Sequence, residues 1–117
     1  MGSGNGKVIS IAKKTFGVTK SLGYEIAPWP YLLSRLNGVK TVRKSIFEVD
    51  LSGVDVVYVY LLPSVLKKLS PVLKKAKLEN TNLKIVSPVF EIPGLNILKE
   101  ITCYQQTWKK DVSIFLY

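Results

Sequence analysis

The feature that most constrains this chain is a glycine-rich turn at residues 2–6, Gly-Ser-Gly-Asn-Gly, which runs directly into an apolar helical pattern. Glu25 follows Gly6 by 19 residues and ends an apolar stretch. A glycine-rich turn that opens a helix, with an acid about 20 residues further on, is how α/β folds hold nucleotide-type cofactors. Such a turn normally follows a β-strand, whereas only Met1 precedes it here. The motif therefore predicts an α/β fold with a nucleotide-type ligand.

Size and composition indicate one globular domain spanning residues 1–117. Apolar residues make up 47% of the chain, which is ordinary for a folded protein. The longest apolar run, residues 54–65, contains Asp55 and Pro63 and is too short to cross a bilayer. The single cysteine, Cys103, excludes an internal disulfide, and the absence of histidine argues against a zinc site. We expect a cytoplasmic protein with no signal peptide, no membrane partner and no metal ion.

The net charge of +9 leaves two interpretations open. Lysine and arginine together number 17 against 8 acidic residues. A surplus of this size is typical of proteins that bind an anionic partner such as RNA. A lysine-coated surface that keeps the protein soluble is the favoured alternative. Arginine, which reads phosphates and bases with two hydrogen bonds, is nearly absent.

The first half of the chain alternates helical and strand patterns. We expect a helix from Gly6 to Phe16 ended by Gly17, because glycine favours the left-handed conformation at helix ends. A strand follows over residues 18–26, and prolines at 28 and 30 suit the first turn of a short second helix. A short strand with its connection is expected over residues 39–47.

The second half predicts three further strands and one helix. Residues 54–60 are β-branched and aromatic, as in a buried parallel strand, and Pro63 opens a helix that Pro71 should split or kink. Residues 82–89 form another strand, and the segments 97–106 and 111–117 form an antiparallel hairpin. The expected fold is α/β: a Rossmann-like, mostly parallel sheet with helices on both faces and an antiparallel hairpin at its C-terminal end.

This pattern resembles the class I S-adenosylmethionine-dependent methyltransferases, and within them the small archaeal protein-lysine methyltransferases and their mitochondrial relatives. The resemblance spans nearly the whole chain in the right order. It is carried by Gly-Ser-Gly-Asn-Gly-Lys at 2–7, Gly-Tyr-Glu-Ile-Ala-Pro-Trp at 23–29, Leu-Ser-Arg at 33–35, Phe-Glu-Val-Asp-Leu at 47–51, Asp-Val-Val-Tyr-Val-Tyr-Leu-Leu-Pro at 55–63, and Val-Ser-Pro-Val-Phe-Glu-Ile-Pro-Gly at 86–94.

The resemblance implies a set of residues that bind S-adenosylmethionine. The glycines of the turn would let the backbone approach the methionyl part of the cofactor, and the helix N-terminus would face its carboxylate. Glu25 would accept hydrogen bonds from both ribose hydroxyls. A solvated acid at the end of a strand is the alternative for Glu25. The full implied set is Gly2, Ser3, Gly4, Asn5, Gly6, Glu25, Ile26 against the adenine, and Ser45 at its amino group.

The resemblance also places a loop at the methyl group. Residues 60–63, Tyr-Leu-Leu-Pro, stand where many enzymes that methylate amines of nucleic acids carry Asn or Asp followed by two prolines and an aromatic residue. Apart from the Tyr60 hydroxyl, the loop offers no polar side chain. An apolar channel favours the neutral amine that accepts a methyl group. The candidates at this loop are Tyr60, Leu61 and Pro63, and simple core packing is the alternative for Tyr60 and Leu61.

Two departures from the family pattern carry expectations of their own. The family has a helix and a central strand before the glycine turn, and that strand separates those ending at Glu25 and Tyr60. We expect a shortened chain, flanking strands that close up, or a second chain that fills the gap. The acid that holds the adenine amino group is replaced by Ser45, which accepts more weakly. These differences predict weak or absent cofactor binding and self-association through strand edges.

The function expected from the sequence is therefore methyl transfer from S-adenosylmethionine to lysine side chains of proteins. RNA is the second choice of acceptor because of the charge. A non-catalytic, methyltransferase-like interaction module is an alternative of a different class. A dinucleotide dehydrogenase is the most distant one. Its acid spacing fits, but the glycine pattern followed by Tyr-Glu-Ile and the terminal hairpin fit methyl transfer better.

Overall fold

The computed structural model describes residues 2–117, and the chain divides after Val49 into two compact units. Each unit contains both helices and strands, so the expected mixed α/β class is confirmed. Among residues 2–117, no helix combines the length and apolar character needed to cross a membrane. That the two units act as one methyltransferase domain stays a prediction.

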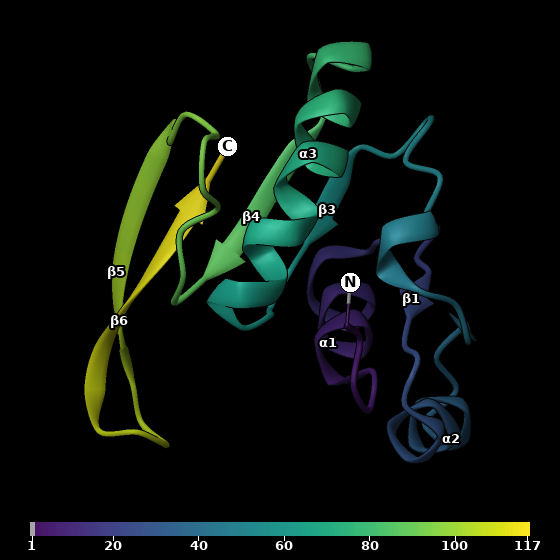
Figure 1. The fold of residues 1–117 in the computed structure, drawn as a ribbon. Helices are drawn as coiled ribbons and strands as arrows, with labels where there is room; N and C mark the ends of the chain where they lie inside the picture. Colours follow the sequence, from purple (N-terminus) through teal and green to yellow (C-terminus); the bar gives the residue numbers. More distant parts are fainter. Residues whose placement is uncertain (1) are drawn as a thin grey trace. The chain divides into compact units, whose positions relative to one another are not determined.

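The first unit consists of two α-helices, two short parallel strands and one turn of 3-10 helix (Figure 1). Glycine at position 17 ends the first helix in the left-handed conformation, as expected (φ 64°). Pro28 stands at the start of the second helix, again as expected. The elements are α1 (Lys7–Phe16), β1 (Gly23–Tyr24), α2 (Pro28–Leu36), β2 (Thr41–Val42) and η1 (Ile46–Glu48).

Both strands of this unit are shorter than predicted. The strand expected over residues 18–26 is reduced to Gly23–Tyr24, and the one over 39–47 to Thr41–Val42 followed by η1. β1 pairs only with β2, with Gly23 opposite Thr41. A regular ladder needs a partner, so residues beyond the shared register are not strand. The ladder still continues as a single bond from the Glu25 backbone N–H to the Val42 carbonyl oxygen, at 3.2 Å.

The second unit is a four-stranded sheet with one long helix. The strand order is β3-β4-β6-β5, in which β3 and β4 are parallel and the other two pairs antiparallel, so the predicted C-terminal hairpin is confirmed. The elements are β3 (Val56–Tyr58), α3 (Pro63–Glu79), β4 (Lys84–Pro88), β5 (Lys99–Gln105) and β6 (Lys110–Leu116).

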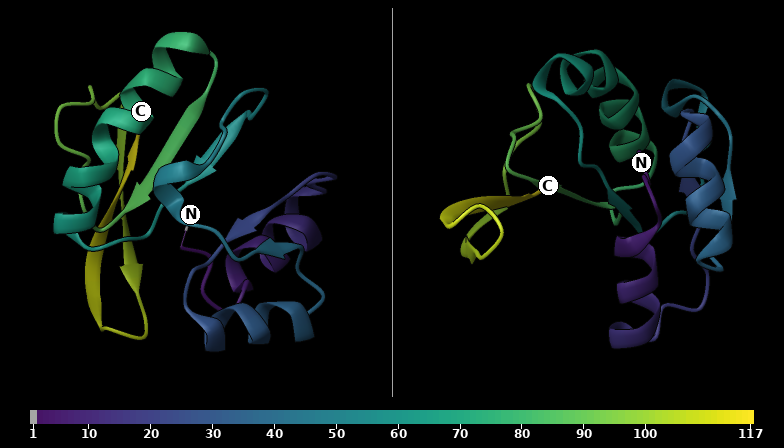
Figure 2. Two further views of the ribbon diagram at one scale, coloured as in Figure 1. Left: turned by 45° about the vertical axis from the view of Figure 1, so that its right-hand side comes forward. Right: turned by 90° about the horizontal axis from the view of Figure 1, so that it is seen from below.

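The core of this unit lies between α3 and the sheet. Figures 1 and 2 show α3 running over one face of β3 and β4. Helical spacing places Leu66, Leu69 and Leu73 on a single side of α3, and all three are fully buried. The strands contribute alternate residues to the same core, among them Val57 and Ile85.

Pro71 does not split α3, which corrects one of the two sequence-based expectations; a kink at Pro71 stays a prediction. The helix is continuous from Pro63 to Glu79 with this proline inside it. A proline removes one backbone hydrogen bond from a helix interior. The buried leucines on either side of Pro71 compensate, because their contacts with the sheet require a continuous helical face.

The strands on either side of the expected central strand each stand at the end of a sheet. β1 stands at an end of the order β1-β2, and β3 stands at an end of the order β3-β4-β6-β5. In the part of the chain that the structure describes, these two strands therefore pair in separate sheets. That the flanking strands close up on each other stays a prediction.

Candidate functional site

The glycine-rich turn has a backbone that only glycine adopts without strain. The φ angles of Gly2, Gly4 and Gly6 are 66°, 53° and 79°. A Cβ added at Gly6 would lie 2.8 Å from Cγ2 of the buried Val39, whereas one added at Gly4 would meet nothing within 4 Å. Gly6 thus serves internal packing, and Gly4 presents open backbone to solvent.

Glu25 is fixed against this turn. Its Oε2 accepts a hydrogen bond from the Gly4 backbone N–H, and its Oε1 accepts one from the Ala27 backbone N–H, both at 2.9 Å. The Ser3 N–H donates to the Tyr24 carbonyl oxygen at 3.0 Å, which secures the turn beside the end of β1. The sequence-based expectation that the glycines and the acid lie together is met. Each carboxylate oxygen retains a further lone pair for a ligand donor.

Ser3 occupies a tight and polar position in the turn. Its Oγ is buried and has no hydrogen-bond partner among the described residues. A Cβ added at Gly23 would lie 2.7 Å from this oxygen, so only glycine at position 23 admits the serine so close to β1. A buried hydroxyl without a partner is uncommon in folded proteins. It is one polar group of the turn that the chain itself leaves unsatisfied.

The other residues implied for the cofactor lie around the same turn or at the adjacent loops. Ile26 directly follows Glu25 and is 63% exposed, so its apolar surface is open. The Asn5 Oδ1 accepts a bond from the Lys7 backbone N–H at 3.2 Å and thereby supports the first turn of α1. Sequence reasoning missed Arg43, whose Nε donates to the Ile26 carbonyl oxygen at 3.3 Å.

Ser45 has a local structural role. Its Oγ accepts a hydrogen bond from the Phe47 backbone N–H at 3.4 Å and so caps η1. The hydroxyl proton remains able to donate, but its acceptor capacity is partly used. That Ser45 takes the place of the family's carboxylate, as a weaker acceptor, stays a prediction.

The predicted acceptor loop follows β3 in the second unit. Pro63 begins α3, and Leu62 precedes it as the N-cap residue. Tyr60 is 44% exposed, so the alternative that it is a core side chain is wrong. Burial raises the pKa of Tyr58, and the neighbouring Tyr60 raises it further. The Tyr58 phenol is therefore uncharged at neutral pH. The loop at residues 60–63 contains no acidic or basic side chain and is mostly apolar.

Sequence reasoning missed one residue near this loop. The Trp108 ring lies 6.5 Å from the Tyr60 ring between centroids, and the Lys110 Nζ stands 5.6 Å from the Trp108 centroid. The only sign of Trp108 in the sequence was a tryptophan in the short link between two predicted strands. Nothing in the sequence indicated its contact with Tyr60, because the two residues are 48 positions apart.

The residues of the turn fit an adenosyl cofactor. Gly4 leaves open space where a Cβ would stand, so a ligand can approach the backbone there, and Glu25 provides a carboxylate held in place by two backbone donors. Within residues 2–117, no group of three or more His, Cys, Asp or Glu side chains is arranged to hold a metal ion.

Comparison with known proteins identifies the family of this chain. It is 38% identical over 104 residues to a protein-lysine N-methyltransferase of Saccharolobus islandicus (strain REY15A), an alignment that covers 82% of this chain and 63% of the relative. It is 33% identical over 101 residues to the adenine nucleotide translocase lysine N-methyltransferase of Mus musculus, covering 80% of this chain and 43% of the relative. The chain thus spans less than two thirds of each of these curated relatives.

Solved structures agree with this relationship. An RNA methyltransferase from Salinibacter ruber in complex with S-adenosyl-L-homocysteine has a TM-score of 0.80 and 26% identity, over 99% of this chain and 75% of its own. The ribosomal protein L11 methylase of Lactobacillus delbrueckii subsp. bulgaricus, with a TM-score of 0.66, 16% identity and coverage of 99% and 66%, shares the fold. A family model described as the ANTKMT methyltransferase domain matches residues 1–99. The chain belongs to this family of class I S-adenosylmethionine-dependent methyltransferases.

Proposed function

We propose that this chain carries the cofactor-binding turn and the acceptor loop of an S-adenosylmethionine-dependent protein-lysine methyltransferase. The observation that carries the proposal is the pair of 2.9 Å hydrogen bonds that hold Glu25 between Gly4 and Ala27. The names of the two curated relatives, both lysine N-methyltransferases, support lysine as the acceptor.

Within the first unit, each proposed cofactor residue has a distinct task. Gly4 admits the ligand to open backbone, Glu25 accepts the ribose hydroxyls, and the exposed Ile26 covers one side of the adenine. Ser45 offers a hydroxyl to the adenine amino group. S-Adenosylmethionine, when bound, supplies an electrophilic methyl group on a sulfonium centre.

Within the second unit, the loop at residues 60–63 serves the acceptor amine. A lysine must lose its proton before its nitrogen can attack, and an apolar surface lowers the pKa of an ammonium group. Transfer of a methyl group then requires mainly alignment of the reacting atoms. Tyr60, Leu61 and Pro63 meet this need with apolar surface and a single hydroxyl.

The proposal is tested by two measurements on the purified chain. Isothermal titration with S-adenosylhomocysteine measures cofactor binding, and intact-mass and peptide mass spectrometry locate methyl groups after incubation with S-adenosylmethionine and an acceptor protein. We expect methyl-lysine, and its loss in Glu25→Ala. Methylated RNA without methyl-lysine would contradict the proposal.

The sequence-based prediction of weak cofactor binding is tested in the same titration. A micromolar affinity would contradict it.

RNA is the second candidate acceptor because of two observations. The Salinibacter ruber neighbour is an RNA methyltransferase, and α3 exposes Lys67, Lys68, Lys74 and Lys75. Binding whose logarithm falls steeply with the logarithm of salt concentration would favour RNA. A chain that binds neither RNA nor the cofactor would match the non-catalytic alternative.

Self-association and a cytoplasmic location are part of the same proposal. β1 and β3 each stand at the end of a sheet, and Val56 on β3 is 56% exposed. Strands at the end of a sheet are places where a second chain can pair. Light scattering is expected to give a mass above that of one chain. A strictly monomeric mass would contradict pairing through these edges.

A further inference from the structure

Two aromatic rings from distant parts of the second unit meet beside the acceptor loop. Tyr60 directly follows the strand region of β3, and Trp108 lies in the turn between β5 and β6. Their ring centroids are 6.5 Å apart at an interplanar angle of 36°, a tilted geometry within the range of favourable aromatic pairs. Both side chains are nearly half exposed, at 44% and 45%, so a ligand can reach them.

The strand register explains why the two rings lie at the same edge of the sheet. β3 and β4 are parallel, so their carboxyl ends point the same way. β6 pairs with β4 in strand register through residues 114–116, with a further hydrogen bond from the Val89 N–H to the Ser113 carbonyl oxygen, whereas it pairs with β5 along residues 110–116. Residues 110–113 therefore continue past the carboxyl end of β4 and bring the hairpin turn beside the loop at residues 60–63. Carboxyl ends of parallel strands are where α/β sheets bind their ligands.

An ammonium group already lies on this surface. The Lys110 Nζ is 5.6 Å from the Trp108 ring centroid, within the distance at which a cation is attracted to an aromatic face. Tryptophan has the strongest such attraction of the aromatic side chains. Lys110 is exposed, so a lysine from another protein can take its place. The position of the Lys110 side chain thus shows that this aromatic surface accepts an ammonium group.

We propose that Tyr60 and Trp108 form an aromatic ledge that receives the lysine side chain of the protein acceptor and displaces Lys110. The proposal rests on the proposed function and adds the residues that select the acceptor. The two rings cover the aliphatic stem of the incoming lysine, and the indole face attracts its ammonium group when the acceptor docks. The proton then passes to water before the neutral amine attacks the methyl group at the apolar loop. Aromatic rings also stack on nucleobases. Lysine is favoured because an ammonium group is seated on the ring and the loop lacks an amide or carboxylate for a base.

The experiment follows the tryptophan indole N–H signals by NMR in the full chain without cofactor. The chain has two tryptophans, and Trp29, which is 67% exposed in the other unit, is an internal control. The probe is N-acetyl-lysine amide, and its uncharged analogue is N-acetyl-norleucine amide. We expect a saturable shift of the Trp108 signal with the lysine probe and a smaller one with norleucine. Equal shifts at both tryptophans, no shift, or a Trp108 shift with adenosine monophosphate alone would overturn the proposal.

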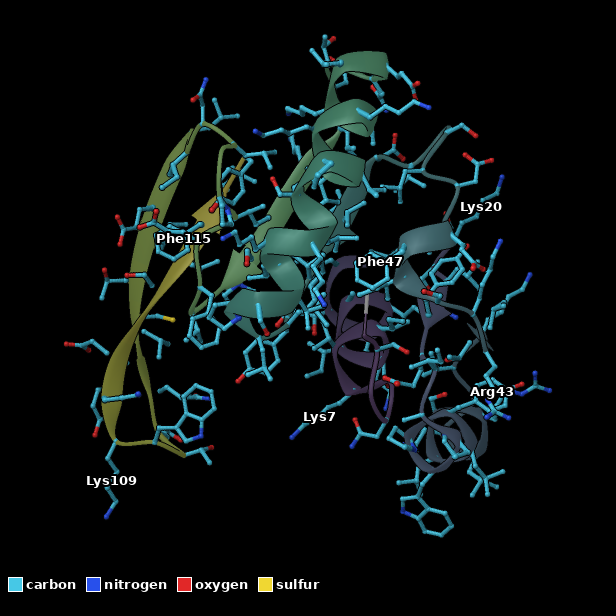
Figure 3. All side chains as sticks on the ribbon, viewed as in Figure 1. Lys7, Lys20, Arg43, Phe47, Lys109 and Phe115 are labelled. Atoms are coloured by element: carbon cyan, nitrogen blue, oxygen red, sulfur yellow. The ribbon has the colours of Figure 1, made fainter. Side chains whose placement is uncertain are left out.

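Two matched substitutions sharpen the test. Lys110→Met removes the competing ammonium and should tighten binding of the lysine probe by about 2- to 5-fold. Lys109→Met is the control, because Figure 3 shows Lys109 at the tip of the hairpin with its side chain extending away from the strands. Unchanged affinity in Lys110→Met, or equal gains in both variants, would contradict displacement.

Turnover gives an independent measurement. Trp108→Leu should raise KM for the acceptor several-fold and leave kcat and the KM for S-adenosylmethionine unchanged, with circular dichroism as the check on folding. A fall in kcat alone would contradict a role in receiving the acceptor. The NMR titration needs neither cofactor nor turnover. Failure of the ledge and failure of the methyltransferase proposal are therefore distinguishable.

Discussion

The Gly4 backbone N–H donates a hydrogen bond to Oε2 of Glu25 at 2.9 Å, across 21 residues of chain. The other carboxylate oxygen is held by the Ala27 N–H at the start of α2. Two fixed donors on one carboxylate restrict its rotamers before any ligand arrives. A ligand that uses the remaining lone pairs therefore loses less conformational entropy on binding.

Glu25→Gln should weaken binding of S-adenosylhomocysteine by about tenfold, since hydrogen bonds to a charged group contribute about 1.5–3 kcal/mol. One end of the amide is a donor and would face the N–H of Gly4 or Ala27, so the free energy of unfolding should also fall by about 1 kcal/mol. Isothermal titration and chemical denaturation measure the two effects. Glu48→Gln, an exposed acid in the same unit, is the control and should change neither. Wild-type affinity in Glu25→Gln would refute the ribose role.

Gly4→Ala and Gly38→Ala form a matched pair. Both glycines have a positive φ, 53° and 70°, and an added Cβ would meet nothing within 4 Å at either. Each substitution should lower the free energy of unfolding by about 1 kcal/mol through backbone strain. Only Gly4→Ala should weaken cofactor binding, because its methyl group fills the open face of the turn. Equal affinities for the two variants would show that the cofactor does not approach Gly4.

Gly6→Ala should be more destabilising than either of these changes. Its Cβ would lie 2.8 Å from Cγ2 of Val39, in addition to the strain of a φ of 79°. We expect a loss of about 2–3 kcal/mol in thermal or chemical unfolding. The double variant Gly6→Ala with Val39→Ala should be less destabilised than the sum of the two single variants, because the clash is relieved. Additive losses would mean that the two residues are not in contact.

Tyr117→Phe tests a buried hydroxyl in the second unit. The Tyr117 oxygen accepts a hydrogen bond from the Ile92 backbone N–H at 2.7 Å, and both residues are buried. Losing this acceptor leaves the buried Ile92 N–H unpaired, so the free energy of unfolding at pH 7 should fall by about 1–3 kcal/mol. Tyr104→Phe, at 62% exposure, is the control and should change stability little.

The same tyrosine predicts a dependence on alkaline pH. Burial raises the pKa of Tyr117 above its ordinary value of 10.0. Its stabilising effect is therefore complete below pH 10 and is lost as the pH rises toward the folded-state pKa, because the unfolded chain ionises first. Tyr117→Phe should show a shallower loss of stability above pH 10. A decline as steep as that of the wild type would contradict a raised pKa.

The helices were predictable because their boundaries are local. Gly17 ends α1 and Pro28 and Pro63 begin α2 and α3, and each acts through its own backbone preferences. The course of α3 through Pro71 was not predictable, since burial of Leu69 and Leu73 against the sheet outweighs the local cost of a proline. The lengths of β1 and β2 were overestimated, because a strand ends where its partner ends.

The sequence by itself determined the order of the elements and the class of fold, because turn residues and apolar periodicity act over short stretches of chain. The resemblance of its motifs to a known family implied the family and the candidate cofactor residues. Only the tertiary structure decided that Gly4 binds Glu25 and that Trp108 meets Tyr60. Both contacts depend on strand register between segments that are distant in sequence, and register is set by packing of the whole unit.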